Sequence, residues 1–354
     1  MKKILILILI TALMILSCKE VPTDVNTSPD NSENSNNNTI SPTPPPNQIL
    51  PNEEDMCQIS DNTTSEDIKK FLTEKKDIIK NKYNNTIYFK GSITRDSYQG
   101  TKSLGYHLEK ALNEAFEENI KADFSKVDFK NNKIPAHFFS ISMLNTMYVT
   151  NIVIPDTITS IGEWAFFSHK SLETIIIPHS VTSIPDLAFK YCEKLKEIAI
   201  PDSVTSIGNN AFEYCQSLTY INLPDSVSTI GRQAFVLCTS LKSIKIPPKV
   251  ETIERQTFEN CHSLTEVVIP DSITEIKEWA FHNCKNLEKL EYLGIDKSKI
   301  KQVETQPAFE SSGKNIWYLY LPNVKSQNGN KEEWQKFLLL SRRWNDVKFE
   351  EHIN

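Results

Sequence analysis

The sequence predicts an α/β solenoid, in which short coils stack on one another between an N-terminal and a C-terminal cap. A phrase of 23 residues recurs six times between residues 149 and 293. A fixed period of this length is typical of solenoids, whose units bury their apolar sides only against their neighbours. The recurring residues are Pro155, Pro178, Pro201, Pro224, Pro247 and Pro270; Phe166, Phe189, Phe212, Phe235, Phe258 and Phe281; and Leu172, Leu195, Leu218, Leu241, Leu264 and Leu287.

The composition excludes some classes of partner. The chain has 354 residues and a formal net charge of −6, with acidic and basic residues interspersed. This mild acidity gives no electrostatic footprint for nucleic acid. Five of the seven cysteines share one repeat position, which indicates packing rather than the disulfide framework of a small secreted domain.

Residues 1–18 are predicted to be a targeting segment. Lys2 and Lys3 precede an apolar run that is too short for a typical membrane span. The run ends in Ser17-Cys18, which resembles a bacterial lipobox. The resemblance implies that Cys18 is diacylated and anchors the mature chain to a membrane, at the outer membrane or the cell surface. An ordinary secretory signal or a single membrane anchor is the alternative.

Residues 19–64 are predicted to be a disordered tether. They are rich in Asn, Ser, Thr and Pro and cannot bury enough apolar surface to offset the loss of chain entropy. The prolines favour an extended spacer that lifts the folded part off the membrane. A leader with no length requirement is the alternative, and Cys57 is expected to be an incidental thiol.

Residues 65–148 are expected to cap the first coil. The pattern predicts a helix from Ser65, with Ser65 as its N-cap, to about Tyr83, and a second helix over 104–120. Strands are predicted over 86–89, ended by Gly91, and over 122–129. Residues 134–139 resemble the second half of a repeat, so the cap leads directly into the array. A separate domain with enzymatic or carbohydrate-binding activity is the alternative, although no catalytic constellation is visible.

Each repeat begins with a short strand whose side chains alternate between two faces. In the coil around Ile221, Ile221 and Leu223 are expected to point inward and Tyr220 and Asn222 outward. Gly231 is expected to permit an unusual backbone angle. Beyond it, Ala-Phe and Cys are expected to lie on a short helical turn at the opposite edge.

The phrase from Ile200 to Leu218 resembles the BspA-type leucine-rich repeat of bacterial surface proteins. The resemblance implies a leucine-rich repeat solenoid over 149–322, without enzymatic activity or cofactor. It also implies adhesion to host matrix proteins such as fibronectin, or to other cells. Because the consensus residues are scaffold, they do not identify the ligand.

Two repeat positions suggest metal sites but have simpler explanations. Cys192, Cys215, Cys238, Cys261 and Cys284 are expected to pack as a ladder of small buried residues, with His169 at the equivalent position of the first coil. A metal site of Cys261, His262, His282 and Cys284 is disfavoured because no C-x-x-C pair occurs. The aspartates after the prolines are expected to shape turns rather than to bind calcium.

The positions that the consensus leaves free on the strand face are the candidate binding residues. They mix charged, aliphatic and aromatic groups, which suits recognition of another protein. Side chains that merely cover the sheet are the alternative. The candidates are Asn151, Val153, Thr174, Ile176, Glu197, Ala199, Tyr220, Asn222, Ser243, Lys245, Glu266 and Val268, and, beyond Lys289 and Glu291, Tyr318 and Tyr320.

The array is expected to end in an atypical unit. Residues 294–303 read as an insertion, Ala308-Phe309 as a further Ala-Phe step, and 319–322 as a further strand. Residues 323–354 are expected to form the C-terminal cap, with a helix over 332–343 and a strand over 347–349. The sequence thus predicts a lipid-anchored surface protein that binds proteins, with a periplasm-facing scaffolding lipoprotein as an alternative.

Overall fold

The computed structural model describes residues 50–98, 102–116, 119–141, 148–296, 298, 301–302, 308–309, 318–325 and 346–350. All of them belong to one compact unit, residues 49–354. The expected signal peptide, Cys18 and most of the expected tether lie outside the described residues, as does the helix expected over 332–343.

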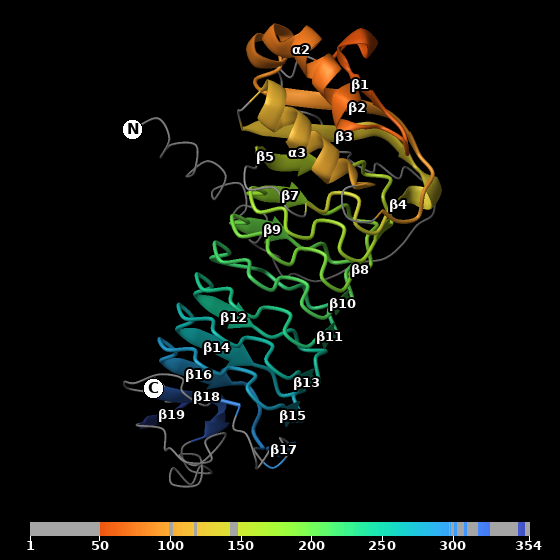
Figure 1. The fold of residues 1–354 in the computed structure, drawn as a ribbon. Coiled ribbons are helices and arrows are strands. Elements are labelled where there is room, and N and C mark those ends of the chain that lie inside the picture. Colours follow the sequence, from red (N-terminus) through yellow and green to blue (C-terminus); the bar gives the residue numbers. More distant parts are fainter. Residues whose placement is uncertain are drawn as a thin grey trace, which may run out of the picture. The chain divides into compact units, whose positions relative to one another are not determined.

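The cap is a run of parallel strands joined by two helices at one end of the coil stack (Figure 1). After a short 3-10 turn, Glu53–Asp55, its elements in chain order are β1 (Cys57–Ile59), α2 (Ser65–Asn81), β2 (Thr86–Ile93), α3 (Leu104–Ala115) and β3 (Ile120–Phe129). β1 pairs with β2, β2 with β3, and β3 with the first strand of the repeats, all in parallel. The cap therefore extends the sheet of the solenoid as well as covering its end.

Four details of the cap correct the sequence-based expectation. Residues 50–64 are folded rather than part of a tether, because Cys57 and Ile59 on β1 are buried in the core. The N-cap of α2 is Thr64, since its hydroxyl accepts the Asp67 N–H and the Asp67 carboxylate accepts the Thr64 N–H. β2 continues through Gly91, which has a φ of 128°, to Ile93. α3 ends at Ala115, and Ile120 already belongs to β3.

The long strands of the repeats form two parallel sheets along one side of the stack (Figure 1). One has the order β1-β2-β3-β5-β7-β9 and the other β12-β14-β16-β18-β19. Between them, the coil around Ile221 joins the ladder only by a bridge from Ala199 to Asn222. The strands are β5 (Val149–Val153), β7 (Thr174–Ile176), β9 (Glu197–Ala199), β12 (Ser243–Lys245), β14 (Glu266–Ile269), β16 (Lys289–Tyr292), β18 (Tyr318–Lys325) and β19 (Asp346–Glu350).

A second row, made of two-residue strands, lies alongside the row of long strands, beyond the proline of each coil (Figure 1). Pro224 and its counterparts are followed by a turn, in which the Val227 N–H donates to the Pro224 carbonyl at 3.0 Å. The strands are β4 (Lys133–Ile134, after the 3-10 turn Lys130–Asn132), β6 (Ser160–Ile161), β8 (Ser183–Ile184), β10 (Ser206–Ile207), β11 (Thr229–Ile230), β13 (Thr252–Ile253), β15 (Glu275–Ile276) and β17 (Lys301–Gln302).

The glycine that follows this second strand has a different role from the expected one. Gly231 does not adopt a positive φ. A Cβ at Gly231 would instead lie 2.6 Å from the backbone nitrogen of Asn209 in the preceding coil. The glycine is needed because the two backbones approach closely, not because the turn requires a left-handed residue.

The third side of each coil is a series of turns closed by i→i−3 hydrogen bonds, in place of a regular helix. In the coil of Phe189, the Ala188 N–H donates to Pro185 O and the Cys192 N–H to Phe189 O. Two residues per coil are left-handed, Leu187 and Tyr191 in this coil. These turns also bond along the stack, since the Phe189 N–H donates to the Ala211 carbonyl at 2.8 Å.

The core is a column of phenylalanine rings that are parallel and in contact. The centroids of Phe212 and Phe235 lie 5.3 Å apart, with an interplanar angle of 8°. Each offset-stacked pair contributes about 0.5–1.5 kcal/mol beyond its buried area. The column begins at Phe139 and ends at Phe309.

This column confirms two expectations about degenerate units. Phe139 stacks on Phe166, so residues 134–139 are the second half of a coil. Phe309 stacks on Phe281 at 4.8 Å, as expected of a further Ala-Phe step. Strand β18 continues the ladder, and β19 confirms the final strand expected over 347–349.

Candidate functional site

The outward side chains of the long strands form two straight columns. The ladder register places Asn151 beside Thr174 and Thr174 beside Glu197, and it places Ile176 beside Ala199. Inward side chains such as Ile175 and Ile198 are buried in the core. The first column holds Asn151, Thr174, Glu197, Tyr220, Ser243 and Glu266, and the second Val153, Ile176, Ala199, Asn222, Lys245 and Val268.

The N-terminal half of this face is apolar and open. Val153 is 40% exposed, Ile176 76% and Tyr220 58%, and Ala199 is also exposed. Ile176 and Ala199 are direct ladder neighbours, and Tyr220 lies in the next coil. These four residues, Val153, Ile176, Ala199 and Tyr220, are called the apolar strip below.

In the C-terminal half of the face, charged side chains form ion pairs with one another. The Lys289 ammonium lies 2.5 Å from Glu266 and 3.2 Å from Glu291. The hydrogen bond with Glu266 raises the pKa of Lys289, so this lysine is charged at neutral pH. Val268, the apolar residue of this half, is only partly exposed.

An acidic rim borders the apolar strip where the chain turns after each proline. Asp156, Asp202 and Asp225 are exposed there. Asp225 lies 4.0 Å from Lys245, whereas Asp156 and Asp202 make no ion pair with any described residue. A surface hollow opens beside the rim and is lined by Asp202, Asn222, Leu223, Pro224, Asp225, Ser226 and Lys245.

The cap extends both columns, which the sequence reasoning missed. Lys121 pairs with Asn151 and Asp123 with Val153 in the register of β3 and β5. Lys121 is exposed and Asp123 is buried. The alternation of polar residues about Ala122 resembles the alternation about each central Ile of the repeats, so a signal for this extension was present in the sequence.

Tyr318 and Tyr320 are placed through their backbone only. Tyr318 pairs with Lys289 and Tyr320 with Glu291, in the register that continues the two columns. Their side chains lie outside the described part of the structure.

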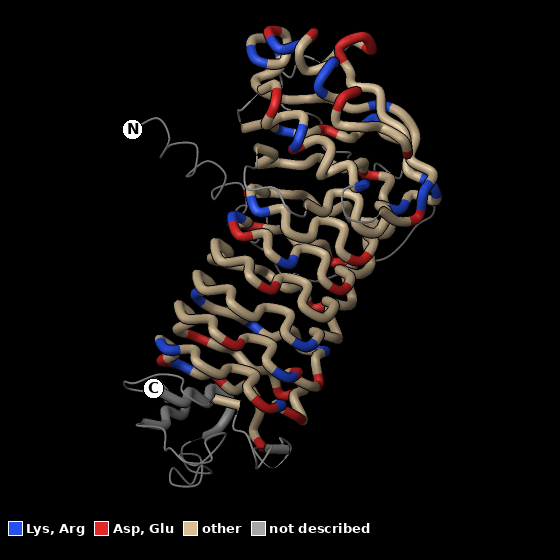
Figure 2. Tube along the Cα trace, viewed as in Figure 1, with Lys and Arg blue, Asp and Glu red and all other residues tan. Residues whose placement is uncertain are grey.

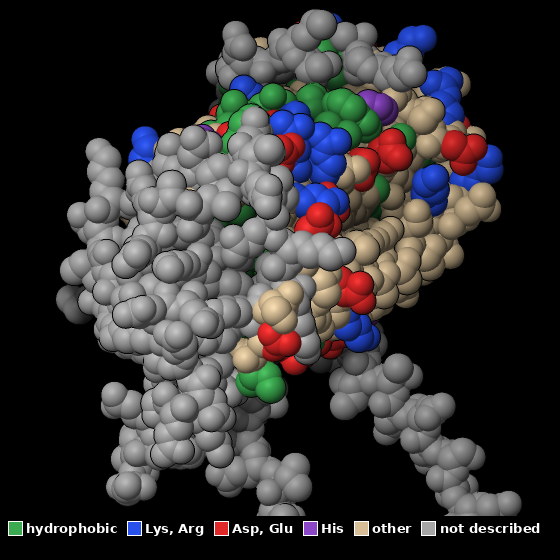
Figure 3. Space-filling view, turned by 90° about the horizontal axis from the view of Figure 1, so that it is seen from below, with side chains coloured by type: hydrophobic (Ala, Val, Ile, Leu, Met, Phe, Trp, Pro, Cys, Tyr) green, Lys and Arg blue, Asp and Glu red, His purple; other side chains and the backbone are tan. Residues whose placement is uncertain are grey.

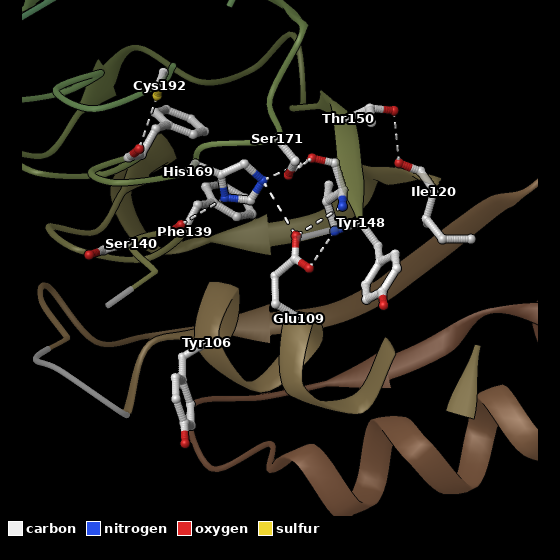
Figure 4. A network of polar contacts seen from close by, with 12 residues as sticks. Tyr106, Glu109, Ile120, Phe139, Ser140, Tyr148, Thr150, His169, Ser171 and Cys192 are labelled. Carbon is white, nitrogen blue, oxygen red and sulfur yellow. Dashed lines mark hydrogen bonds and ion pairs between the residues drawn. The ribbon is translucent and has the colours of Figure 1, made fainter. Parts of the chain in front are cut away.

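A buried polar network joins α3 to the first coils (Figure 4). The Glu109 carboxylate accepts the N–H groups of Tyr148 at 2.7 Å and Val149 at 2.9 Å. The two ring nitrogens of His169 each lie 3.2 Å from a carbonyl oxygen, those of Phe139 and Val149. His169 Nε2 is 4.0 Å from Glu109, and Ser171 donates to Val149 O at 2.6 Å. The network thus satisfies backbone groups where the cap meets the repeats, and its side chains Glu109, His169 and Ser171 are buried.

The cysteine column occupies the same layer as His169. Each thiol donates to the carbonyl of a phenylalanine in the preceding coil, as Cys192 does to Phe166 at 3.3 Å. Burial raises the pKa of these thiols, which keeps them protonated. Among the described residues no three His, Cys, Asp or Glu side chains are grouped so as to hold a metal ion.

Charges of both signs are interspersed over the described coils (Figure 2), and the same mixture is visible in the space-filling view (Figure 3). The structure therefore shows no extended surface of one sign in these views. None of the described helices has the length and apolar character needed to cross a bilayer.

Comparison with known proteins identifies the repeat. The family model of the BspA type Leucine rich repeat region matches six copies, over residues 132–243, 166–288 and 228–318. No curated protein matches the sequence.

Several solved structures are similar. A leucine-rich repeat protein from Bacteroides ovatus is 28% identical, with 57% of each chain covered and a TM-score of 0.45. The leucine-rich repeat protein of T. pallidum is 26% identical over 50% of this chain and 81% of its own, with a TM-score of 0.38. A leucine rich cell surface protein from Faecalibacterium prausnitzii is 20% identical over 75% of this chain and 84% of its own, with a TM-score of 0.34. The chain thus spans little more than half the length of the Bacteroides protein.

Proposed function

The chain belongs to the BspA-type leucine-rich repeat family, and from this premise we propose that it binds other proteins through the outward face of its long strands. The apolar consensus residues of the repeat are buried in the core, so they are not available to a ligand. The face between them is where this chain differs from coil to coil.

One observation carries the proposal. Five large hydrophobic side chains are exposed among the described residues, and three of them, Val153, Ile176 and Tyr220, lie on this face. Exposed apolar groups that gather on one surface are typical of protein-binding sites. The strip also has the composition of an interface centre, where an aromatic anchor sits among aliphatic residues.

The proposed binding set is wider than the strip. It comprises both columns from Asn151 to Val268 and extends to Tyr318 and Tyr320, whose backbone register continues the columns. Lys121 is added to it on the cap side because it is exposed in the same column.

The proposed setting is the cell surface. The segment ending at Cys18 resembles a lipobox, which supports lipid anchoring, and the family resemblance supports adhesion to host matrix or to other cells. The anchor and the adhesive role both belong to the proposal. A scaffolding lipoprotein that faces the periplasm is the competing assignment.

Binding is tested with full-length protein and paired variants. We expect Tyr220→Ala combined with Tyr318→Ala to reduce capture of a host-matrix protein fraction, because Tyr220 is exposed in the first outward column and the backbone register of Tyr318 continues that column. Lys249→Ala, which is exposed on the turn after Pro247–Pro248, is the matched control. Equal capture by all three proteins would refute binding through the strand face.

Location is tested on intact cells. Brief protease treatment should remove a surface label from the protein without lysing the cells. Protection of the label until the envelope is opened would instead support the periplasm-facing assignment. Metabolic labelling with a fatty acid that is lost in Cys18→Ser tests the anchor.

A further inference from the structure

We propose that the apolar strip and the acidic rim together recognise a partner segment that carries aliphatic side chains next to lysine or arginine. This inference rests on the proposed function and names the chemistry of the partner. It follows from how charge and apolar surface are divided along the strand face.

The two halves of the strand face differ in whether their charged side chains are paired. In the C-terminal half, Lys289 pairs with both Glu266 and Glu291, so a partner would have to break these pairs before contacting the charges. In the N-terminal half, Ile176 is the most exposed large hydrophobic residue described, and Glu197, which lies beside Thr174 in the other outward column, makes no ion pair with any described residue. The N-terminal half is therefore the half that gains free energy when it is covered.

The apolar strip combines a small side chain with larger ones. The ladder places Ile176 beside Ala199, and adjacent coils are spaced at about the 4.8 Å of neighbouring strands. Tyr220 stands at the coil where the ladder weakens to a single bridge. The strip therefore presents apolar groups of different size. The small residue Ala199 lies beside Ile176 in the second column, with Asn222 on its other side, and Tyr220 stands in the first column of the next coil. An aliphatic side chain of a partner fits above the small residue.

The exposed charges around the apolar strip are mainly acidic. Asp156, Asp202 and Glu197 are exposed and make no ion pair within the described residues. Lys121 is the exposed lysine of the outward columns in this half, at its cap end. Asp202 and Asp225 also line the hollow next to Asn222, with Lys245 4.0 Å from Asp225 at its edge. Charge complementarity at an interface favours the partner of opposite sign, here a lysine or arginine that enters the hollow.

A second copy of this chain is a poor occupant by the same reasoning. Two copies that meet through this face would bring the acidic residues of one strip close to those of the other. Like charges placed together at an interface oppose association.

The test uses full-length protein and immobilised synthetic peptides in four sets. The first alternates Ile or Val with Lys and Ser, the second replaces Lys with Glu, the third with Ser, and the fourth replaces the aliphatic residues with Ser. We expect the aliphatic–Lys set to bind about tenfold more tightly than the aliphatic–Glu set, and the difference to shrink as salt is raised.

Variants assign the two contributions. Ile176→Ser should weaken binding of the aliphatic–Lys peptides about tenfold, since burial of this side chain is lost. Asp202→Asn with Asp225→Asn should weaken it severalfold and flatten its salt dependence. Asp271→Asn and Ile295→Ser are the matched controls, because Asp271 occupies the equivalent turn position in the other half and Ile295 is an exposed aliphatic residue outside the two columns; both should leave binding unchanged. Val268→Ser, in the C-terminal half of the face, should weaken binding less than Ile176→Ser.

The outcomes separate this inference from the broader function. If Ile176→Ser weakens all aliphatic sets equally and Lys gives no advantage over Glu, the face binds protein but the proposed partner chemistry is wrong. If Val268→Ser weakens binding as much as Ile176→Ser, the assignment to the N-terminal half is wrong. Unchanged binding in every strand-face variant would refute the face itself. Concentration-dependent dimerisation abolished by Ile176→Ser would replace the partner with a second copy.

Discussion

At the residue scale, the cysteines show that a residue type known for its reactivity can be unreactive at a buried repeat position. Cys192, Cys215, Cys238, Cys261 and Cys284 are buried, and each donates to a backbone carbonyl. Cys57 in the cap is also buried, which raises the pKa of its thiol to about 12. Reactive thiols need a lowered pKa and access to solvent, and these residues have neither.

We expect these six thiols to resist modification in the folded protein. Colorimetric thiol titration of the Cys18→Ser variant should detect almost no reaction in native buffer and all six groups after denaturation. Rapid labelling of Cys57 alone would mean that β1 opens independently of the solenoid. Rapid labelling of the column would contradict its burial.

Asp55 is a second residue whose environment determines its chemistry. It is buried, and it accepts from Lys75 at 3.0 Å, from Lys82 at 3.1 Å and from Tyr83 at 2.9 Å. The hydrogen bond from Lys75, together with those from Tyr83 and Lys82, lowers the pKa of Asp55 to about 2. This residue lies in the segment that the sequence assigned to the tether.

Replacing Asp55 with Asn should destabilise the cap by roughly 1–3 kcal/mol at neutral pH, since the buried Tyr83 hydroxyl and the two lysines lose their charged acceptor. The pKa is lower in the folded state, so the stabilisation is present above the unfolded value of 3.8 and is lost as the pH falls through about 2. The difference between wild type and variant in urea unfolding should therefore shrink between pH 4 and pH 2. Glu53→Gln, an exposed neighbour, should show no such difference.

At the element scale, the joint between α3 and the repeats holds two buried titratable groups of opposite type. Burial raises the pKa of Glu109 to about 7 and lowers the pKa of His169 to about 4. Glu109 alone stabilises below its ordinary value of 4.5, and this contribution is lost as the pH rises through 7. His169 alone stabilises above its ordinary value of 6.5, and this contribution is lost as the pH falls through 4. Between these limits the two dependences have opposite sign and cancel.

Single variants should therefore uncover opposite pH dependences. His169→Cys retains a donor for Phe139, as in the other coils, and its stability should fall by about 1.4 kcal/mol per unit as the pH rises from 4.5 to 7. Glu109→Gln should gain stability at a similar rate as the pH rises from 4 to 6.5. Urea unfolding across this range measures all three proteins. Parallel profiles would show that neither group titrates as assigned.

At the scale of the whole molecule, we expect the stacked phenylalanine rings to supply the contacts by which adjacent coils stabilise one another. A central ring such as Phe235 stacks on two others, Phe212 and Phe258, so it is buried from both sides. In a solenoid such nearest-neighbour contacts supply most of the stability.

Phe235→Ala should reduce the free energy of unfolding by about 3–5 kcal/mol, because it leaves a cavity in the middle of the column. Leu237→Asn in the same coil is the control. Leu237 is partly exposed and has a φ of 60°, a conformation that Asn tolerates well, so this change should be neutral or slightly stabilising. Equal losses in both variants, measured by urea unfolding, would contradict a core centred on the rings.

Much of the fold was predictable because the same local pattern of inward and outward residues recurs six times in the sequence. The alternation about Ile221 places Tyr220 and Asn222 outward, and the Ala-Phe step at 308–309 extends the core, as expected. Gly231 was misread because its role depends on the backbone of Asn209, which lies a whole coil away in the sequence. The start of the fold was misplaced because Cys57 and Ile59 form a strand only when paired with β2.

The sequence by itself determined the period, the inward and outward positions of each strand and the family, since these follow from local patterns that recur. Tertiary structure alone decided that β1 to β3 continue the sheet and that Glu109 meets His169. It also decided that Lys289 neutralises Glu266 while Glu197 has no described partner. These features depend on which side chains adjacent coils bring together. A 23-residue period determines the spacing of those side chains, but it does not determine which residue types occupy the positions.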